Sequence, residues 1–343
     1  MPEAIPQQEL KFVRIEDRQI IDGVDDNLMR VSPCKYEKPI RRMEKMIHDQ
    51  WTHYEVEMKT DKAHFDEFPP KIQRSVQRAL GFLSNLDGIQ LSTLATAIGN
   101  YITCPEYRFA VTEQTRQEMI HCLTYGRIVD TLGMDADETY TLYRTNPLLA
   151  EKNEHVLRLT SLLRNEYTPE NFVRAIAGNI VIEAIMFQSG FRLFFTLNRN
   201  GGRIPGVANN IRYIARDEVE HTYLFADMWY DLKADRPELF TPEVLADCRE
   251  IIRVGALLEI QWGLHIVDGG IPGMSPEMVE GGIKFLANKG CTLLGLDAVF
   301  PEQTFDPQAW VDDYMAENGI IIESNFFEKS KVLDYQDKGL EWD

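Results

Sequence analysis

Apolar residues recur at intervals of three and four along most of the chain, whereas the alternating runs typical of strands are short and rare. Proline-containing signals such as "TPE" and "CPE" stand where several of these periodic segments begin. We therefore expect an all-α protein built as a large helical bundle. The predicted helices span residues 36–58, 70–101, 105–132, 148–165, 168–199, 206–234, 242–266 and 275–290.

Two of these segments, 168–199 and 206–234, are longer than usual and are apolar over much of their circumference, which is typical of helices in the middle of a bundle. The run "IVIEAIMF" nevertheless contains one carboxylate, Glu183. An ionised side chain buried without a partner would cost several kcal/mol, so proteins neutralise it, pair it or bind a metal ion to it. We therefore expect a partner opposite Glu183.

The two ends of the chain differ from its body. Residues 1–25 are polar and contain prolines, and the last stretch carries charges throughout with isolated aromatic residues and no apolar stripe. The sequence therefore predicts an N-terminal arm at 1–25, a helical domain at 26–325 and a flexible C-terminal tail at 326–343.

Two Glu-x-x-His pairs, Glu118–His121 and Glu218–His221, lie inside long predicted helices. Positions three apart share one face of a helix, so each pair can direct a carboxylate oxygen and an imidazole nitrogen at the same cation. A single pair means little, because 54 acidic residues among 343 place an acid three positions before about one of seven histidines by chance.

The setting of the two pairs distinguishes them from a chance match. We interpret Asp61–His64, which lies in a polar stretch, as such a chance match. Each pair follows a helix with a single acid in apolar surroundings: Asp87 precedes the first pair by 31 residues, and Glu183 precedes the second by 35. A helix with a single acid, followed by a helix with a Glu-x-x-His pair, forms a helix hairpin. Two such hairpins would bring four carboxylates and two imidazoles into one core. That cluster of negative charge requires divalent cations, and its ligands suit iron or manganese better than structural zinc.

Composition and charge exclude several other classes of protein. A net charge of −18 argues against binding to nucleic acid or to an anionic membrane. The N-terminus lacks a secretory pattern and no uninterrupted apolar stretch reaches about 20 residues, so we expect a cytoplasmic protein. The five cysteines form no C-x-x-C motif, so any thiol chemistry is expected on a partner.

Two single acids with two Glu-x-x-His pairs are the pattern of ferritin-like dimetal carboxylate proteins. Within that superfamily the chain resembles the small, radical-generating subunit of class I ribonucleotide reductase through the ordered strings "NLDGIQ", "EMIHCLTY", "IEAIMF", "IARDEVEH" and the late "NFFE" and "LDYQ". The resemblance implies a ferritin-like bundle with additional helices and a dimetal site in its core. The implied metal ligands are Asp87, Glu118, His121, Glu183, Glu218 and His221.

The same resemblance implies that the site reacts with dioxygen to form a tyrosyl radical on Tyr125, which lies one helical turn after His121. The radical would pass through Asp217 and Trp51 to Tyr335 on the tail, and from there to a cysteine of the large subunit. There the thioredoxin- or glutaredoxin-dependent holoenzyme would reduce ribonucleotides. Two iron ions are the first expectation, with a manganese pair or a manganese–iron pair as alternatives.

The resemblance also implies a homodimer whose tail docks on the large subunit. Phe187, Phe191 and Ile214 would form an apolar wall that shields Tyr125. Glu220 departs from the apolar residue of many relatives, and we expect an exposed charge that points away from the metals.

The nearest alternative is another ferritin-like dimetal oxidase, such as a desaturase or a ligand-binding oxidase, which would need neither a transfer route nor a docking tail. Iron storage is a second alternative, and a purely structural helical protein is a third. Because the chain has no phosphate-binding loop and no cysteine pair, we expect that it cannot reduce nucleotides alone.

Overall fold

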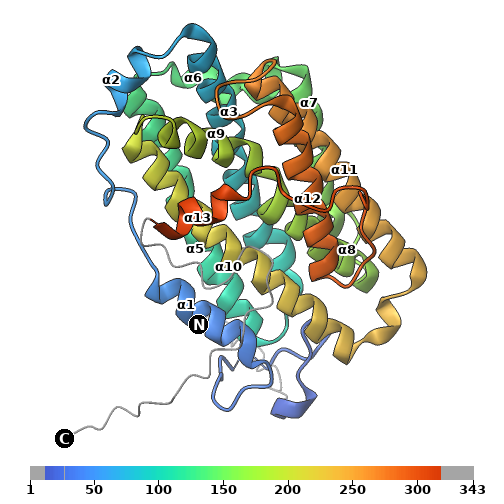
Figure 1. The fold of residues 1–343 in the computed structure, drawn as a ribbon. Coiled ribbons are helices and arrows are strands. Elements are labelled where there is room, and N and C mark those ends of the chain that lie inside the picture. Colours follow the sequence, from blue (N-terminus) through green and yellow to red (C-terminus); the bar gives the residue numbers. More distant parts are fainter. Residues whose placement is uncertain (1–11, 27, 318–343) are drawn as a thin grey trace, which may run out of the picture.

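The computed structural model describes residues 12–26 and 28–317, and within them the chain forms a helical bundle without strands (Figure 1). This confirms the predicted all-α class. The α-helices are α1 (Glu37–His48), α2 (Asp61–Asp66), α3 (Pro70–Thr93), α4 (Gly99–Tyr101), α5 (Pro105–Leu132), α6 (Ala136–Thr145), α7 (Pro147–Asn165), α8 (Pro169–Val181), α9 (Gln188–Arg199), α10 (Pro205–Asp235), α11 (Pro242–Val267), α12 (Pro276–Leu293) and α13 (Trp310–Glu317). Short 3₁₀ turns occupy Ile15–Asp17 and Pro237–Leu239, and π-helical turns occupy η2 (Leu94–Ile98) and η3 (Ile182–Met186).

Several helices begin with a proline in the first turn, directly after a capping residue. The side chains of Asn146, Thr168, Thr241 and Ser275 each accept a hydrogen bond from a backbone N–H of the helix that follows. The cap satisfies a backbone group that would otherwise have no partner, and proline fits the first helical position because it needs no N–H there. These signals explain why the predicted starts of α7, α8, α11 and α12 agree with the structure to within a residue.

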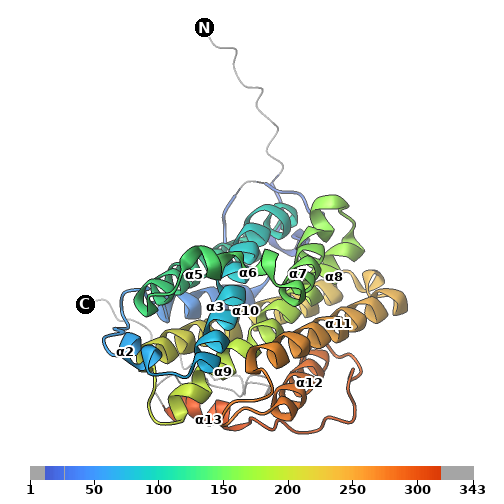
Figure 2. The same cartoon turned by 90° about the horizontal axis from the view of Figure 1, so that it is seen from above.

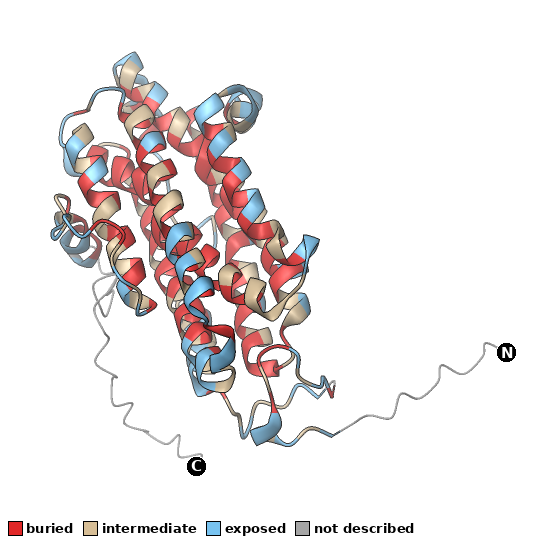
Figure 3. Cartoon of the chain, turned by 90° about the vertical axis from the view of Figure 1, so that its right-hand side faces the viewer, coloured by how far each residue is buried: buried red, intermediate tan, exposed pale blue. Residues whose placement is uncertain are grey.

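The middle of the bundle consists of α3, α5, α10 and the continuous segment α8–η3–α9. Seen from above, α5 lies on one side of α3 and α10, whereas α11 and α12 lie on the other (Figure 2). Buried residues follow the inward faces of the helices (Figure 3). Within the described residues, Pro169–Arg199 alone has the length and hydropathy of a membrane span, but its most apolar window is entirely buried inside the protein.

The predicted helix at 36–58 is wrong in its second half, because α1 ends at His48. The chain then turns so that Trp51 is buried and its indole N–H donates to Asp217 on α10 at 2.7 Å. The guanidinium of Arg127 on α5 donates hydrogen bonds to two backbone carbonyls of the loop after Trp51 and so holds this loop in place. The polar partners of the loop therefore override the helical pattern of its sequence.

Two predicted continuous helices, 70–101 and 168–199, are each interrupted by a π-helical turn. The prediction also omitted α2, α6 and α13. α2 has six residues and α13 has eight, and α6 buries only Thr139, so none of them carries a long apolar stripe.

Residues 1–11 of the predicted arm and the whole predicted tail at 326–343 lie outside the described residues. The same holds for Tyr335. The domain boundaries at 25 and 325 therefore stay predictions.

Asp61 and His64, the pair taken as a chance match, hold the start of α10. Asp61 accepts a hydrogen bond from the backbone N–H of Val207 at 2.7 Å, and His64 accepts one from Ile204 at 3.1 Å. The residue that precedes α10, Ile204, has no side-chain oxygen and adopts a left-handed conformation with φ of 43°. Side chains of α2 therefore replace the missing cap.

We predict that Asp61→Ala lowers the free energy of unfolding by about 1–2 kcal/mol, because the first turn of α10 loses its acceptor. Asp61→Asn is the matched control, since it keeps an acceptor oxygen and should lose clearly less. Urea unfolding followed by circular dichroism measures both variants. An Asp61→Ala protein as stable as the wild type would contradict this role.

Candidate metal centre

The six predicted ligands converge in the middle of the bundle, and all six side chains are completely buried. They come from four segments that are distant in sequence. Asp87 lies on α3, Glu118 and His121 lie on α5, Glu183 lies on η3, and Glu218 and His221 lie on α10. The helices therefore bring together the residues that the sequence had placed in two separate hairpins.

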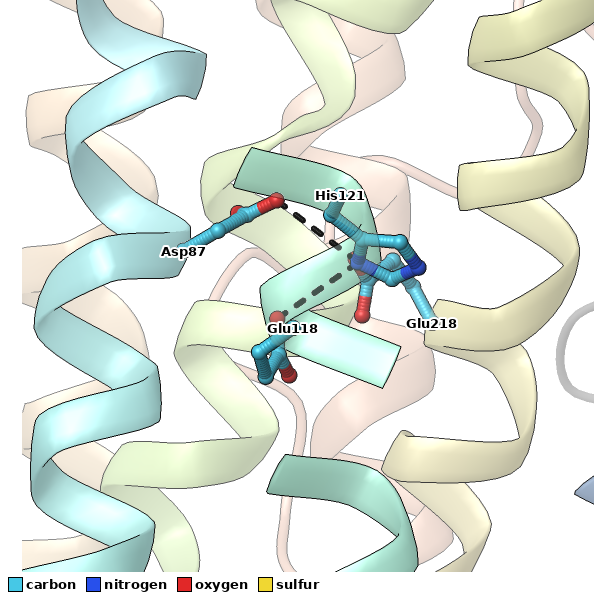
Figure 4. A group of neighbouring side chains, drawn as sticks. All are labelled: Asp87, Glu118, His121 and Glu218. Atoms are coloured by element: carbon cyan, nitrogen blue, oxygen red, sulfur yellow. Dashed lines mark ion pairs between the residues drawn. The ribbon is translucent and has the colours of Figure 1, made fainter. Parts of the chain in front are cut away.

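The first cluster surrounds His121, which points toward Asp87, Glu118 and Glu218 (Figure 4). Its Nδ1 lies 3.1 Å from Glu218 Oε1, 3.5 Å from Glu118 Oε2 and 3.6 Å from Asp87 Oδ2. One ligand atom from each of the four residues lies within 4.8 Å of all the others. Three carboxylates and one imidazole can thus bind a single cation.

The second cluster surrounds His221 and contains Glu118, Glu183 and Glu218. Its Nδ1 lies 2.7 Å from Glu218 Oε2, 3.3 Å from Glu118 Oε1 and 3.8 Å from Glu183 Oε2. Glu118 and Glu218 belong to both clusters and direct different oxygens into each. The two clusters could therefore hold two neighbouring cations, with Glu118 and Glu218 offering an oxygen to each.

The polar atoms that face the clusters support this fit, because many of them have no hydrogen-bond partner. They are both carboxylate oxygens of Asp87, Oε2 of Glu118, Nδ1 of His121, Oε2 of Glu183 and Oε1 of Glu218. Buried polar atoms are almost always satisfied, so unsatisfied ligand-type atoms around one point indicate a binding site for cations. Carboxylates with one imidazole for each cation suit iron or manganese.

Each histidine is held by a hydrogen bond on its outer nitrogen. His121 Nε2 lies 3.2 Å from Asp217 Oδ2, and His221 Nε2 lies 2.9 Å from Gln117 Oε1. Both partners accept, so the proton of the neutral ring stays on Nε2 and the lone pair of Nδ1 faces the cluster. Such outer partners orient a metal-binding imidazole and fix its tautomer.

Three glutamines complete the surroundings of the ligands, and the sequence analysis did not single them out. Gln90 and Gln114 both donate to Glu183 Oε1, the latter at 2.8 Å, while Gln117 holds His221 as described. Gln90 lies three positions after Asp87, and Gln114 lies four before Glu118. This spacing places each amide on the ligand-bearing face of its helix and could have identified it.

The charges in the clusters shift the pKa values in opposite directions. Burial, followed by repulsion from Glu118, raises the pKa of Asp87 and of Glu183 well above the usual range. Burial alone would lower the pKa of the two histidines, but the carboxylates, led by Glu218, raise it well above normal. Burial would also raise the pKa of Glu218, but both imidazolium groups hold it below its usual range. Without metal ions Asp87, Glu183 and the two histidines therefore retain protons, whereas Glu218 is ionised.

Tyr125 lies on α5, one turn after His121, and is fully buried. Its hydroxyl group has no hydrogen-bond partner. Burial, followed by the charge of Asp87 when that group is ionised, raises the pKa of Tyr125 well above its usual value, so the neutral phenol is the resting form. Phe187 and Phe191 are also buried and stack with ring centroids 5.4 Å apart.

Trp51 and Asp217 form a continuous hydrogen-bonded series with His121. Asp217 Oδ2 accepts from the indole of Trp51 at 2.7 Å and lies 3.2 Å from His121. Arg216 binds the other oxygen of Asp217 at 2.9 Å. Burial would raise the pKa of Asp217, but His121 and Arg216 lower it below the usual range. This carboxylate is therefore ionised and connects the first cluster with the loop after α1.

The expectation that Glu220 is an exposed charge is wrong, because only 13% of its side chain is exposed. It forms ion pairs with Arg42 at 3.1 Å and with Lys45 at 3.7 Å. Both partners lie on α1, which packs against α10. Glu220 therefore fastens α1 to α10.

Comparison with known proteins assigns the chain to a family. Residues 28–307 match the family described as "Ribonucleotide reductase, small chain". The chain belongs to this family. A ribonucleoside-diphosphate reductase subunit beta from Treponema pallidum is 30% identical over 325 residues, which are 92% of this chain and 90% of that protein. The subunit beta from Halalkalibacterium halodurans is 28% identical over 312 residues, 90% of this chain and 89% of that protein.

A solved structure, the ribonucleotide reductase R2 subunit from Clostridium botulinum, has a similar fold with a TM-score of 0.83 and 31% identity. The match covers 89% of this chain and 98% of that one. Membership of the family confirms the predicted ferritin-like fold and identifies the protein as the small subunit of a class I ribonucleotide reductase. It also decides against the desaturase, storage and structural alternatives.

We predict that substitution of a residue shared by the two clusters lowers the metal content more than substitution of a residue that belongs to one cluster. Glu118→Ala should reduce bound metal from two ions per chain toward none, because both positions lose a ligand. Glu183→Ala should leave one ion, because Glu183 belongs only to the second cluster. Metal analysis of the purified, metal-loaded variants measures both.

Glu113→Ala is the control, since Glu113 lies on the same helix and pairs with Arg116 outside the clusters. It should retain two ions. Equal metal loss in Glu118→Ala and Glu183→Ala would contradict the assignment of Glu118 as a shared ligand.

We also predict that metal binding releases protons and strengthens as pH rises. The pKa values of Asp87, Glu183 and the two histidines are raised, so a cation must displace protons that these groups hold in the metal-free protein. Calorimetric titration with Mn²⁺ in buffers of different ionisation enthalpy counts the protons. An affinity independent of pH, with no proton release, would contradict the shifts.

Proposed function

We propose that this small subunit binds two iron ions in its core and keeps an oxidising equivalent as a tyrosyl radical on Tyr125. A manganese pair and a manganese–iron pair are the alternatives, since they use nearly the same ligands. The observation that carries the proposal is the pair of clusters that share Glu118 and Glu218, with Tyr125 one turn from His121. When bound, the metal ions would supply the redox chemistry by which dioxygen, the oxidant, oxidises Tyr125.

Formation of the radical removes one electron and one proton from Tyr125. The phenol is neutral at rest, so the proton must leave with the electron. We assign its acceptance to Asp87, which would be ionised in the metal-loaded protein, whose charge raises the pKa of Tyr125 and whose carboxylate oxygens make no hydrogen bond within the protein. Phe187, Phe191 and Ile214 would exclude water and reductants from the radical.

We further propose that the series His121, Asp217 and Trp51 is the inner part of the transfer route. The hydrogen bonds at 3.2 and 2.7 Å support coupled movement of an electron and a proton between these groups. The ionised Asp217 can hold the proton of either neighbour. The outer part of the route would be Tyr335, which lies outside the described residues, followed by a cysteine of the large subunit.

The large subunit would supply the nucleotide site and the reactive thiols, and the C-terminal tail would dock on it. We expect a cytoplasmic homodimer that reacts with dioxygen and cannot reduce ribonucleotides alone. The names of the similar proteins favour ribonucleoside diphosphates as the substrates of the complete enzyme.

We predict that the metal-loaded, oxygen-exposed protein gives a tyrosyl radical signal in electron paramagnetic resonance. Tyr125→Phe should abolish this signal while the metal content stays unchanged. Tyr107→Phe is the matched control, because Tyr107 is a buried tyrosine on the same helix and should leave the signal intact.

Trp51→Phe separates storage of the radical from its transfer, because it removes the indole that donates to Asp217. This variant should keep the radical but lose ribonucleotide reduction with the large subunit. A wild-type protein that forms no oxidised tyrosyl or metal species with iron or manganese would overturn the proposal.

A further inference from the structure

A second group of charges is buried in the bundle, and the proposed chemistry does not use it. Lys152 on α7 and Glu259 on α11 are both completely buried and form an ion pair. Removal of each charge from water costs several kcal/mol, and replacement of a buried pair by apolar residues is often neutral or stabilising. Because stability alone does not explain the pair, the other groups that Lys152 and Glu259 contact indicate its role.

Both members also bind the main chain of the segment that carries Glu183. Lys152 Nζ donates to the backbone carbonyl of Met186 at 3.0 Å, the last residue of η3. Glu259 Oε1 accepts from the backbone N–H of Ser189 at 2.7 Å, in the first turn of α9. The pair thus spans the junction between η3 and α9.

The regular ladder of helical hydrogen bonds is broken at this junction. In a π-helical turn the bonds connect residues five apart, and the return to an α-helix leaves peptide groups without an internal partner. A buried peptide group without a hydrogen bond is costly. A lysine can donate a hydrogen bond to a backbone carbonyl, and a carboxylate can accept one from a backbone N–H. The two charged side chains therefore provide the hydrogen-bond partners that such a junction requires.

α11 also fixes the segment on both sides of the turn. A Cβ atom on Gly255 would lie 2.3 Å from Val181 Cγ1, and one on Gly263 would lie 2.4 Å from Ser189 Oγ. The end of α8 and the start of α9 therefore contact α11 too closely for a larger residue. If η3 closed into an α-helix, one flank would have to turn by about 100° relative to the other.

We propose that Lys152 and Glu259 are positioning residues that hold η3 in its π-helical form and thereby direct Glu183 at the second divalent cation. Glu183 lies three residues before Met186, within the turn that the pair secures. The proposal rests on the dimetal centre inferred above. It assigns the pair to the cluster around His221 and not to the cluster around His121.

The test is titration of the metal-free, full-length protein with Mn²⁺, followed by calorimetry and by the paramagnetic signal of the free ion. Lys152→Met should weaken binding of one equivalent by about 10- to 100-fold, as for other groups that support a metal ligand. The other equivalent should bind as in the wild type. Arg18→Met is the matched control, because Arg18 is a buried cation paired with Glu106 at 2.7 Å, and it should leave both equivalents unchanged.

A double variant, Lys152→Met with Glu259→Leu, removes both charges and keeps the fold testable if the single variant is unstable. It should unfold at a lower temperature than the wild type, because the backbone groups of Met186 and Ser189 lose their partners, but at a higher temperature than the single variant, because no unpaired charge stays buried. It should also bind one equivalent weakly. Tight binding of both equivalents by this variant would overturn the proposal, as would equal weakening of both. A wild type that binds fewer than two ions would instead contradict the dimetal function itself.

Discussion

Four carboxylates cannot remain ionised within a few ångströms of one another in a dry core unless positive charge lies between them. Asp87, Glu118, Glu183 and Glu218 are completely buried, and their oxygens converge on two neighbouring points. In the metal-free protein, protons on Asp87, Glu183 and the two histidines reduce the repulsion. Two divalent cations would neutralise four carboxylate charges, so the fold and the proposed chemistry depend on the same electrostatic requirement.

This requirement also explains the polar groups that surround the ligands. Asp217 and Gln117 hold the outer nitrogens of the histidines, and glutamine amides hold Glu183. The pair Lys152–Glu259 acts one step further out, on the backbone of the turn that carries this ligand. A metal site in a helical bundle is thus defined by side chains that fix orientation as much as by the ligands themselves.

The sequence was sufficient to predict which acids and histidines converge in the core, because a helix places positions three apart on one face and Glu118 and His121 have this spacing. It also predicted most helix starts, since caps and prolines are local signals. It did not predict the π-helical turn at Glu183, because tertiary contacts from α7 and α11 hold that turn. The end of α1 and the pairing of Glu220 were missed for the same reason: their partners are distant in sequence.

The most direct test of the dimetal centre is a crystal structure of the protein loaded with Mn²⁺, with anomalous scattering used to locate the ions. Two anomalous peaks about 3.5–4 Å apart are expected, which is typical of two-metal sites. Both should lie between Glu118 and Glu218, one beside His121 and the other beside His221. A single peak, or peaks at acidic residues on the surface with none among these side chains, would contradict the account.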